Sequence, residues 1–148
     1  VFTLAHTITL GLAATGVISP PSDIVEPLIA LSIALVAIEN LFFKKPPRWR
    51  PIVIFLFGLL HGLGFAGFFG ELGLPEGQFW SALIGFNIGV EIGQLSVIIL
   101  AIAVLSVWRW RNNIEYTDVV YRRFMILPGS LLIGATGSWW AMERVFLN

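Results

Sequence analysis

Four ionisable side chains lie within apolar stretches of this sequence: His6, Glu39, His61 and Glu91. An ionisable residue at the middle of a bilayer costs roughly 2.5–3.5 kcal/mol to insert, so each one is a candidate for function. Imidazole nitrogens and carboxylate oxygens bind divalent transition ions, and these donors alone do not distinguish Ni²⁺, Co²⁺ and Zn²⁺. The sequence has no cysteine, which excludes thiolate sites. We therefore predict these four residues as metal ligands, and the sequence identifies no catalytic residue.

The segment around Glu91 carries further polar residues at helical spacing. Asn87, Glu91 and Gln94 are spaced i, i+4 and i+7, which places them on one stripe of a helix. Three glycines repeat every four residues over 85–93, roughly on the opposite side, where small residues allow another helix to approach closely. This pattern predicts a central helix with one polar face and one packed face. In the alternative interpretation, Asn87 and Gln94 only join helices and Glu91 is an acid hydrogen-bonded to them.

The two histidines have different neighbours in the sequence. Glycines at i−3, i+1 and i+3 surround His61 and leave room for a ligand, a water molecule or another helix. Thr3 and Thr9 share adjoining parts of one helix face with His6, so their hydroxyls could orient the imidazole or bond to their own backbone. His61 could also be a core histidine satisfied by a carboxylate, and Glu39 could simply reach the interface. The four ionisable residues could form one graded polar path or two small sites.

The composition indicates that lipid surrounds the chain. Of the 148 residues, 57% are hydrophobic and only 12% are charged, whereas soluble domains carry about 25% charged residues. The mean hydropathy is +0.86. The net charge is zero and the nine basic residues form no stripe for nucleic acid, so we expect no nucleic-acid partner.

Apolar runs near the length of about 20 residues that crosses a bilayer define the fold class. They predict about five transmembrane helices in an all-α integral membrane bundle, with residues 1–148 as a single domain. Ser22 or Asp23 is a plausible N-cap of the second helix, and Pro128 predicts a kink near the start of the fifth. The predicted helices cover residues 2–18, 24–43, 51–69, 79–107 and 123–146.

Charges in the connections predict the orientation of these helices. Residues 44–50 and 109–123 carry basic side chains, whereas the connections at 19–26 and 70–77 carry only acidic ones. Basic connections stay in the cytoplasm. We therefore expect the first residue of this chain on the cytoplasmic side and the last on the periplasmic side.

Four motifs lie in order at residues 2–10, 38–41, 57–66 and 85–94. Together they resemble the HupE/UreJ family of bacterial membrane proteins over nearly the whole chain. The resemblance implies a multi-pass protein of the bacterial inner membrane that is associated with nickel or cobalt uptake. The Gly-x-Asp-His type motif of a preceding helix in similar family members is absent, which implies that the chain is the C-terminal part of a longer protein. The missing upstream helix would then be a partner and a source of further ligands.

We favour a transition-metal permease or metal-binding membrane protein over an enzyme. The partners expected are the lipid bilayer, the metal ion and the upstream helix, and a homo-oligomer stays open. One alternative is an intramembrane zinc-dependent hydrolase in which Glu91 acts as general base on zinc-bound water. Three firm protein ligands plus one water would favour hydrolysis, whereas a path of sites would favour transport. A second alternative is a structural membrane subunit whose polar residues only specify packing.

Overall fold

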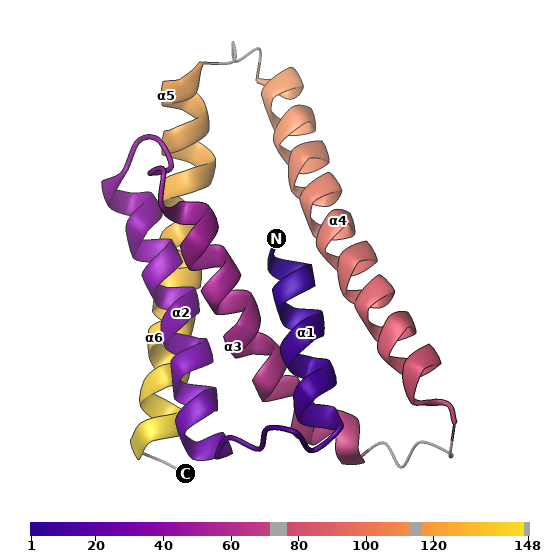
Figure 1. Ribbon diagram of the computed structural model, residues 1–148. Helices are drawn as coiled ribbons and strands as arrows, with labels where there is room; N and C mark the ends of the chain where they lie inside the picture. The colour runs from indigo at the N-terminus through magenta and orange to yellow at the C-terminus, as the bar shows by residue number, and fades with distance from the viewer. Residues whose placement is uncertain (72–76, 113–116, 147–148) are drawn as a thin grey trace.

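The computed structural model describes residues 1–71, 77–112 and 117–146, with the side chains of 66–71 outside the description. The described residues are helical throughout apart from short connections, as the all-α prediction requires (Figure 1). The last three elements form one continuous helical rod. The elements are α1 (Phe2–Ala14), α2 (Ser22–Phe42), α3 (Arg50–Glu71), α4 (Phe79–Arg111), α5 (Asp118–Tyr121), a π-helical turn (Arg122–Ile126) and α6 (Leu127–Phe146).

The end of the first helix and the N-cap of the second differ from the sequence prediction. The first helix ends at Ala14 because Gly16 adopts φ 75°, and the Val17 N–H then donates to the Leu12 carbonyl at 3.0 Å. A helix of 13 residues rises only about 20 Å. The N-cap of α2 is Pro21, with no side-chain hydrogen bond, so the proposed capping role of Ser22 or Asp23 was wrong.

The final rod starts earlier than predicted and contains an irregular turn. It begins at Asp118, five residues before the predicted start, and Thr117 accepts a hydrogen bond from the Val120 N–H at 3.2 Å. The π-helical turn Arg122–Ile126 ends two residues before Pro128. Proline has no N–H and clashes with the carbonyl four residues earlier, and a widened turn accommodates this loss of regular bonding.

Three helical segments are long and apolar enough to cross a membrane: Ser22–Phe42, Phe79–Arg111 and Asp118–Phe146. Two shorter apolar helices, Phe2–Ala14 and Arg50–Phe65, accompany them. The five segments correspond to the five predicted from the sequence. By length alone, the first falls short of the roughly 20 residues that a full span needs.

Close packing in the bundle depends on glycines of α3 and α6. Helix α1 packs along α3, and α2 packs along α6 (Figure 1). A Cβ atom at Gly58 would lie 2.6 Å from the Phe2 carbonyl oxygen, and one at Gly62 would overlap Thr9 Oγ1. On α6, a Cβ at Gly137 would lie 2.9 Å from the backbone of α2. The glycines around His61 therefore make room mainly for a neighbouring helix.

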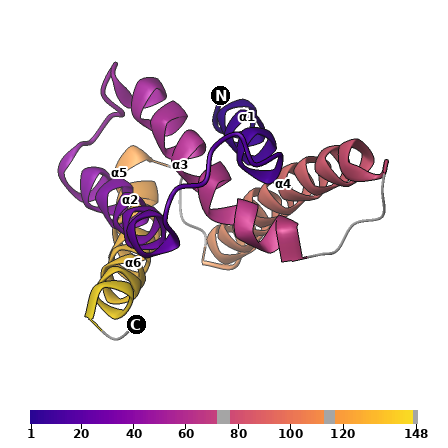
Figure 2. The same cartoon turned by 60° about the horizontal axis from the view of Figure 1, so that its bottom comes forward.

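Helix α4 is not the central helix that the sequence predicted. It lies at the edge of the bundle and approaches α1 with its N-terminal half (Figures 1 and 2). Nothing in the described structure lies within 4 Å of a Cβ placed on the three glycines at 85, 89 and 93. The face of α4 that carries Asn87 meets α1 instead. Among the described residues of α4, Leu83 and Asn87 are the buried ones.

Ionic side chains hold the ends of the α2–α6 pair. Arg122 donates to the carbonyl oxygens of Leu41 and Phe43 at 2.7 and 3.0 Å. These carbonyls have no partner within the helix, and a cation is favourable at a helix C-terminus. At the opposite end, Arg144 of α6 pairs with Glu26 of α2. The sequence analysis had used the basic residues of the connections to predict orientation and had not predicted these contacts.

The contrast between the two glycine sets predicts opposite effects of alanine. Gly62→Ala should lower the free energy of unfolding by about 1–3 kcal/mol, because the new methyl overpacks the α1–α3 contact. Gly89→Ala is the matched control, and it should raise stability by up to about 1 kcal/mol because alanine favours helix and meets open space. Thermal unfolding of the purified variants in detergent measures both. Equal stability of the two variants would contradict the packing described.

Candidate functional site

Polar side chains of α1 and α4 meet in one group, here called the α1–α4 cluster. The Thr3 hydroxyl donates to Glu91 Oε2 at 2.6 Å. The His6 Nδ1 atom lies 3.3 Å from Asn87 Oδ1, which is also 2.6 Å from the Thr7 hydroxyl. The cluster therefore joins two predicted ligands, His6 and Glu91, with two predicted polar neighbours, Thr3 and Asn87.

The hydrogen bonds of Asn87 determine which nitrogen of His6 carries the proton. The Asn87 Nδ2 group donates to the Leu83 carbonyl oxygen at 2.8 Å, so Oδ1, which faces α1, is an acceptor. His6 Nδ1 must then be the donor, which leaves the lone pair of Nε2 available. The His6 side chain is 2% exposed. Its ring stacks on the ring of Phe86, with the two centroids 6.1 Å apart.

His61 has the same tautomer for a different reason. Its Nδ1 lies 2.7 Å from the Phe57 carbonyl oxygen, one turn earlier on α3. A carbonyl oxygen only accepts, so Nδ1 carries the proton and Nε2 keeps its lone pair. His61 lines a cavity of about 270 Å³ between α2, α3 and α6, here called the α2–α3–α6 cavity. The polar residues that share this lining are Ser32, Asn40 and Ser130.

The ring of Phe2 connects the two histidines. It contacts His61 edge-on, with centroids 5.2 Å apart, and it stacks on His6 at 6.1 Å. Phe2 also lines the α2–α3–α6 cavity. The cluster and the cavity are therefore neighbours, with one aromatic side chain in contact with the histidine of each.

The remaining predicted residues lie outside these two places. Thr9 donates to the Leu59 carbonyl oxygen of α3 at 2.6 Å and so stabilises helix packing rather than orienting an imidazole. Glu39 is buried, and within the described residues its Oε1 atom has no hydrogen-bond partner. Gln94 is exposed, and no hydrogen bond in the described ranges involves its side chain.

The structure divides the predicted ligands between two places. Among the described residues, no three histidine, aspartate or glutamate side chains lie close enough together to hold a metal ion. His6 and Glu91 belong to the α1–α4 cluster, whereas His61 belongs to the α2–α3–α6 cavity. Their role as ligands stays a prediction.

The sequence analysis missed Thr7. Its hydroxyl lies 2.7 Å from the Thr3 carbonyl oxygen and 2.6 Å from Asn87 Oδ1, so its single proton serves one of these two acceptors. The available signal was the i, i+4 spacing of Thr3 and Thr7, which places both on the helix face that meets α4.

Comparison with known proteins gives one match. A family model described as "HupE / UreJ protein" matches residues 1–144. No curated protein and no solved structure matches the chain.

Proposed function

Because this chain belongs to the HupE/UreJ family, we propose that it spans the bacterial inner membrane and carries a divalent transition ion, nickel or cobalt, across it. The long apolar segments support the membrane location. The basic connections lie on the cytoplasmic side in this proposal, because positive charge is retained there. Labelling of cysteines placed at Lys45 and Gln78 from either side of the membrane tests this orientation.

The shared tautomer of the two histidines carries the proposal. A histidine that binds a metal through one nitrogen usually donates its other N–H to a carbonyl, an amide or a carboxylate oxygen. Both His6 and His61 already donate through Nδ1, to Asn87 and to the Phe57 carbonyl. Neither Nε2 has a hydrogen-bond partner in the described part of the chain. Each Nε2 atom is therefore available to bind the transported metal ion.

The division of the ligands supports transport over hydrolysis. A zinc hydrolase needs about three firm protein ligands and one water on the same ion. Here one imidazole and one carboxylate, His6 and Glu91, belong to the cluster, and a second imidazole, His61, faces the neighbouring cavity. An ion held by so few protein ligands keeps several waters and leaves readily, as a transported ion must. The two places would act as successive stations, with the Phe2 ring between them.

Uptake of Ni²⁺ into vesicles tests this function directly. Vesicles that contain the purified protein should accumulate Ni²⁺ faster than empty vesicles, as measured with an enclosed metal-sensitive dye. Gln94→Ala is a control that should leave the rate unchanged, because the Gln94 side chain is exposed and makes no contact with either station. Uptake no faster than in empty vesicles would refute transport and favour a structural role for these polar residues.

A further inference from the structure

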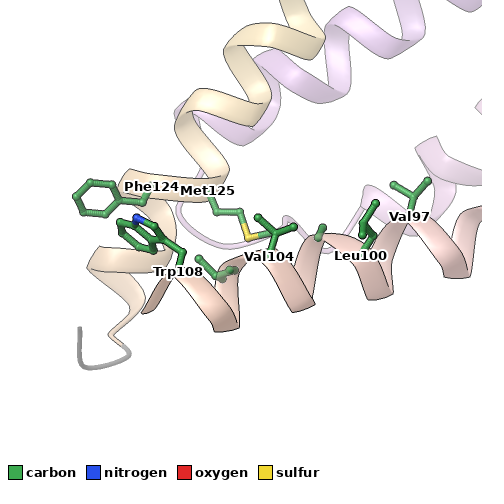
Figure 3. Close-up of a pocket in the computed structure, with 8 residues that line it drawn as sticks. Val97, Leu100, Val104, Trp108, Phe124 and Met125 are labelled. Atoms are coloured by element: carbon green, nitrogen blue, oxygen red, sulfur yellow. The ribbon is translucent and has the colours of Figure 1, made fainter. Parts of the chain in front are cut away.

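An apolar groove lies between the C-terminal half of α4 and the π-helical turn, far along the chain from the cluster. Its volume is about 630 Å³, and the described side chains that line it are hydrophobic (Figure 3). We call it the α4 groove. Its lining consists of Val97, Leu100, Ala101, Val104, Leu105, Trp108, Phe124 and Met125.

The length of the α4 groove matches one leaflet of a membrane. It extends along α4 from Val97 to Trp108, which corresponds to about 16 Å at 1.5 Å per residue. Half of the hydrocarbon core measures about 15 Å. A single extended acyl chain therefore fits along the groove from the midplane to the interface.

Aromatic and basic side chains mark one end of the groove. The rings of Trp108 and Phe124 meet there, with centroids 5.0 Å apart. Arg111, one turn beyond Trp108, lines an adjoining hollow together with Val104 and Trp108. The guanidinium of Arg123 lies 6.0 Å from the centre of the Phe124 ring. An aromatic pair with arginines beyond it is the arrangement expected at a membrane interface.

The charge at this end is suited to a phosphate. Arg111 and Arg123 are exposed, and among the described residues neither forms a salt bridge with a carboxylate. The acidic side chain described in this region is Asp118, at the start of α5. Guanidinium groups bind phosphate oxygens in bidentate fashion, and basic residues beside a membrane segment attract anionic lipids.

We propose that the α4 groove binds one anionic phospholipid, with an acyl chain along its apolar lining and the phosphate held by Arg111 and Arg123. This site is separate from the metal stations and does not depend on the proposed transport. A lipid in the groove would add contacts between the C-terminal half of α4 and the helical rod, beyond the contact between the Trp108 and Phe124 rings.

Lipid retention by the purified protein tests the headgroup contact. Delipidated protein in detergent is titrated with phosphatidylglycerol or with phosphatidylcholine of the same acyl chains, and native mass spectrometry counts the bound lipid. We expect wild type to prefer phosphatidylglycerol. The double variant Arg111→Gln/Arg123→Gln should lose about thirtyfold in affinity for phosphatidylglycerol, and each single substitution about fivefold. The reason is that each basic residue beside a membrane contributes about 1 kcal/mol of attraction to anionic lipids.

Matched variants distinguish binding at this site from nonspecific attraction to basic residues and from nonspecific hydrophobic binding. Lys45→Gln/Arg48→Gln removes two positive charges from another basic connection and should retain the preference. Ala101→Trp fills the groove and should abolish retention of both lipids, whereas Ile99→Trp, on an exposed position of α4 outside the lining, should not. Equal binding of the two lipids by wild type, equal effects of the two double variants, or a dimer without bound lipid would each overturn the proposal.

Discussion

Replacing His61 by alanine is expected to lower the affinity of the α2–α3–α6 cavity for Ni²⁺ by at least about 100-fold, whereas the α1–α4 cluster keeps its own ligands. Loss of a residue that only orients a metal ligand typically costs about 10–100-fold, and loss of the ligand itself should cost at least the upper end of that range. Among the residues that the structure describes, His61 is the one histidine, aspartate or glutamate that lines the α2–α3–α6 cavity, so none of the others there can replace the imidazole. Titration calorimetry and elemental analysis of folded protein measure the change.

Three further variants test how the sites are built. His6→Ala should lower the affinity nearly as much as His61→Ala if both histidines bind one ion. Asn87→Ala should lower it by about tenfold, because His6 loses the acceptor that fixes its tautomer. Gln94→Ala should have no effect. Equal metal content in wild type and His61→Ala, or none in wild type at neutral pH, would mean that these residues serve packing and would refute the permease proposal.

The sequence was sufficient to predict the helices, because hydrophobic length and breakers act locally. The predicted segments correspond to the observed ones, and the main errors occur at ends controlled by backbone geometry. The positive φ of Gly16 shortened the first helix, and the turn Asp118–Tyr121, capped by Thr117, extended the last one. Both depend on hydrogen bonds between neighbouring residues, which apolar periodicity does not report.

The position of α4 could not be predicted from its own sequence. Its glycine face was predicted to pack closely against another helix. In the structure, glycines of α3 and α6 make the close helix–helix contacts. Which of several compatible faces is used depends on all helices at once. The pairing of His6 with Asn87 across 81 positions of the chain is a consequence of that choice, although each residue had been recognised separately as polar within an apolar helix.

The burial of Glu39 also follows from tertiary structure. The sequence placed it near the end of its helix, where a carboxylate could reach the interface. In the structure Arg50 binds the neighbouring Asn40 at 2.7 Å, and Arg122 binds carbonyls at the end of α2. Glu39 forms no salt bridge with either arginine. The burial of Glu39 without a salt bridge to Arg50 or Arg122 therefore depends on how the helices pack, which the sequence of α2 alone does not show.

The pH dependence of Ni²⁺ binding should show how many histidines bind each ion. Metal and protons compete for the same Nε2 lone pair, so the affinity must fall as the pH is lowered through the range in which imidazole takes up a proton. The sign is fixed: the neutral imidazole binds and the protonated one does not. Below that range, each histidine that must release a proton weakens binding by about tenfold per pH unit.

The slope distinguishes two stations from one shared site. If His6 and His61 serve separate stations, the dissociation constant should rise about tenfold per pH unit, and each single alanine variant should keep that slope for the ion it still binds. If both histidines bind one ion, the rise should be about 100-fold per unit in wild type and should halve on a logarithmic scale in either variant. Calorimetric titrations between pH 7.5 and about 5, with folding checked at each pH by circular dichroism, supply the slopes. An affinity that does not change over this interval would exclude both histidines as ligands, because no imidazole can bind Ni²⁺ and a proton at the same nitrogen.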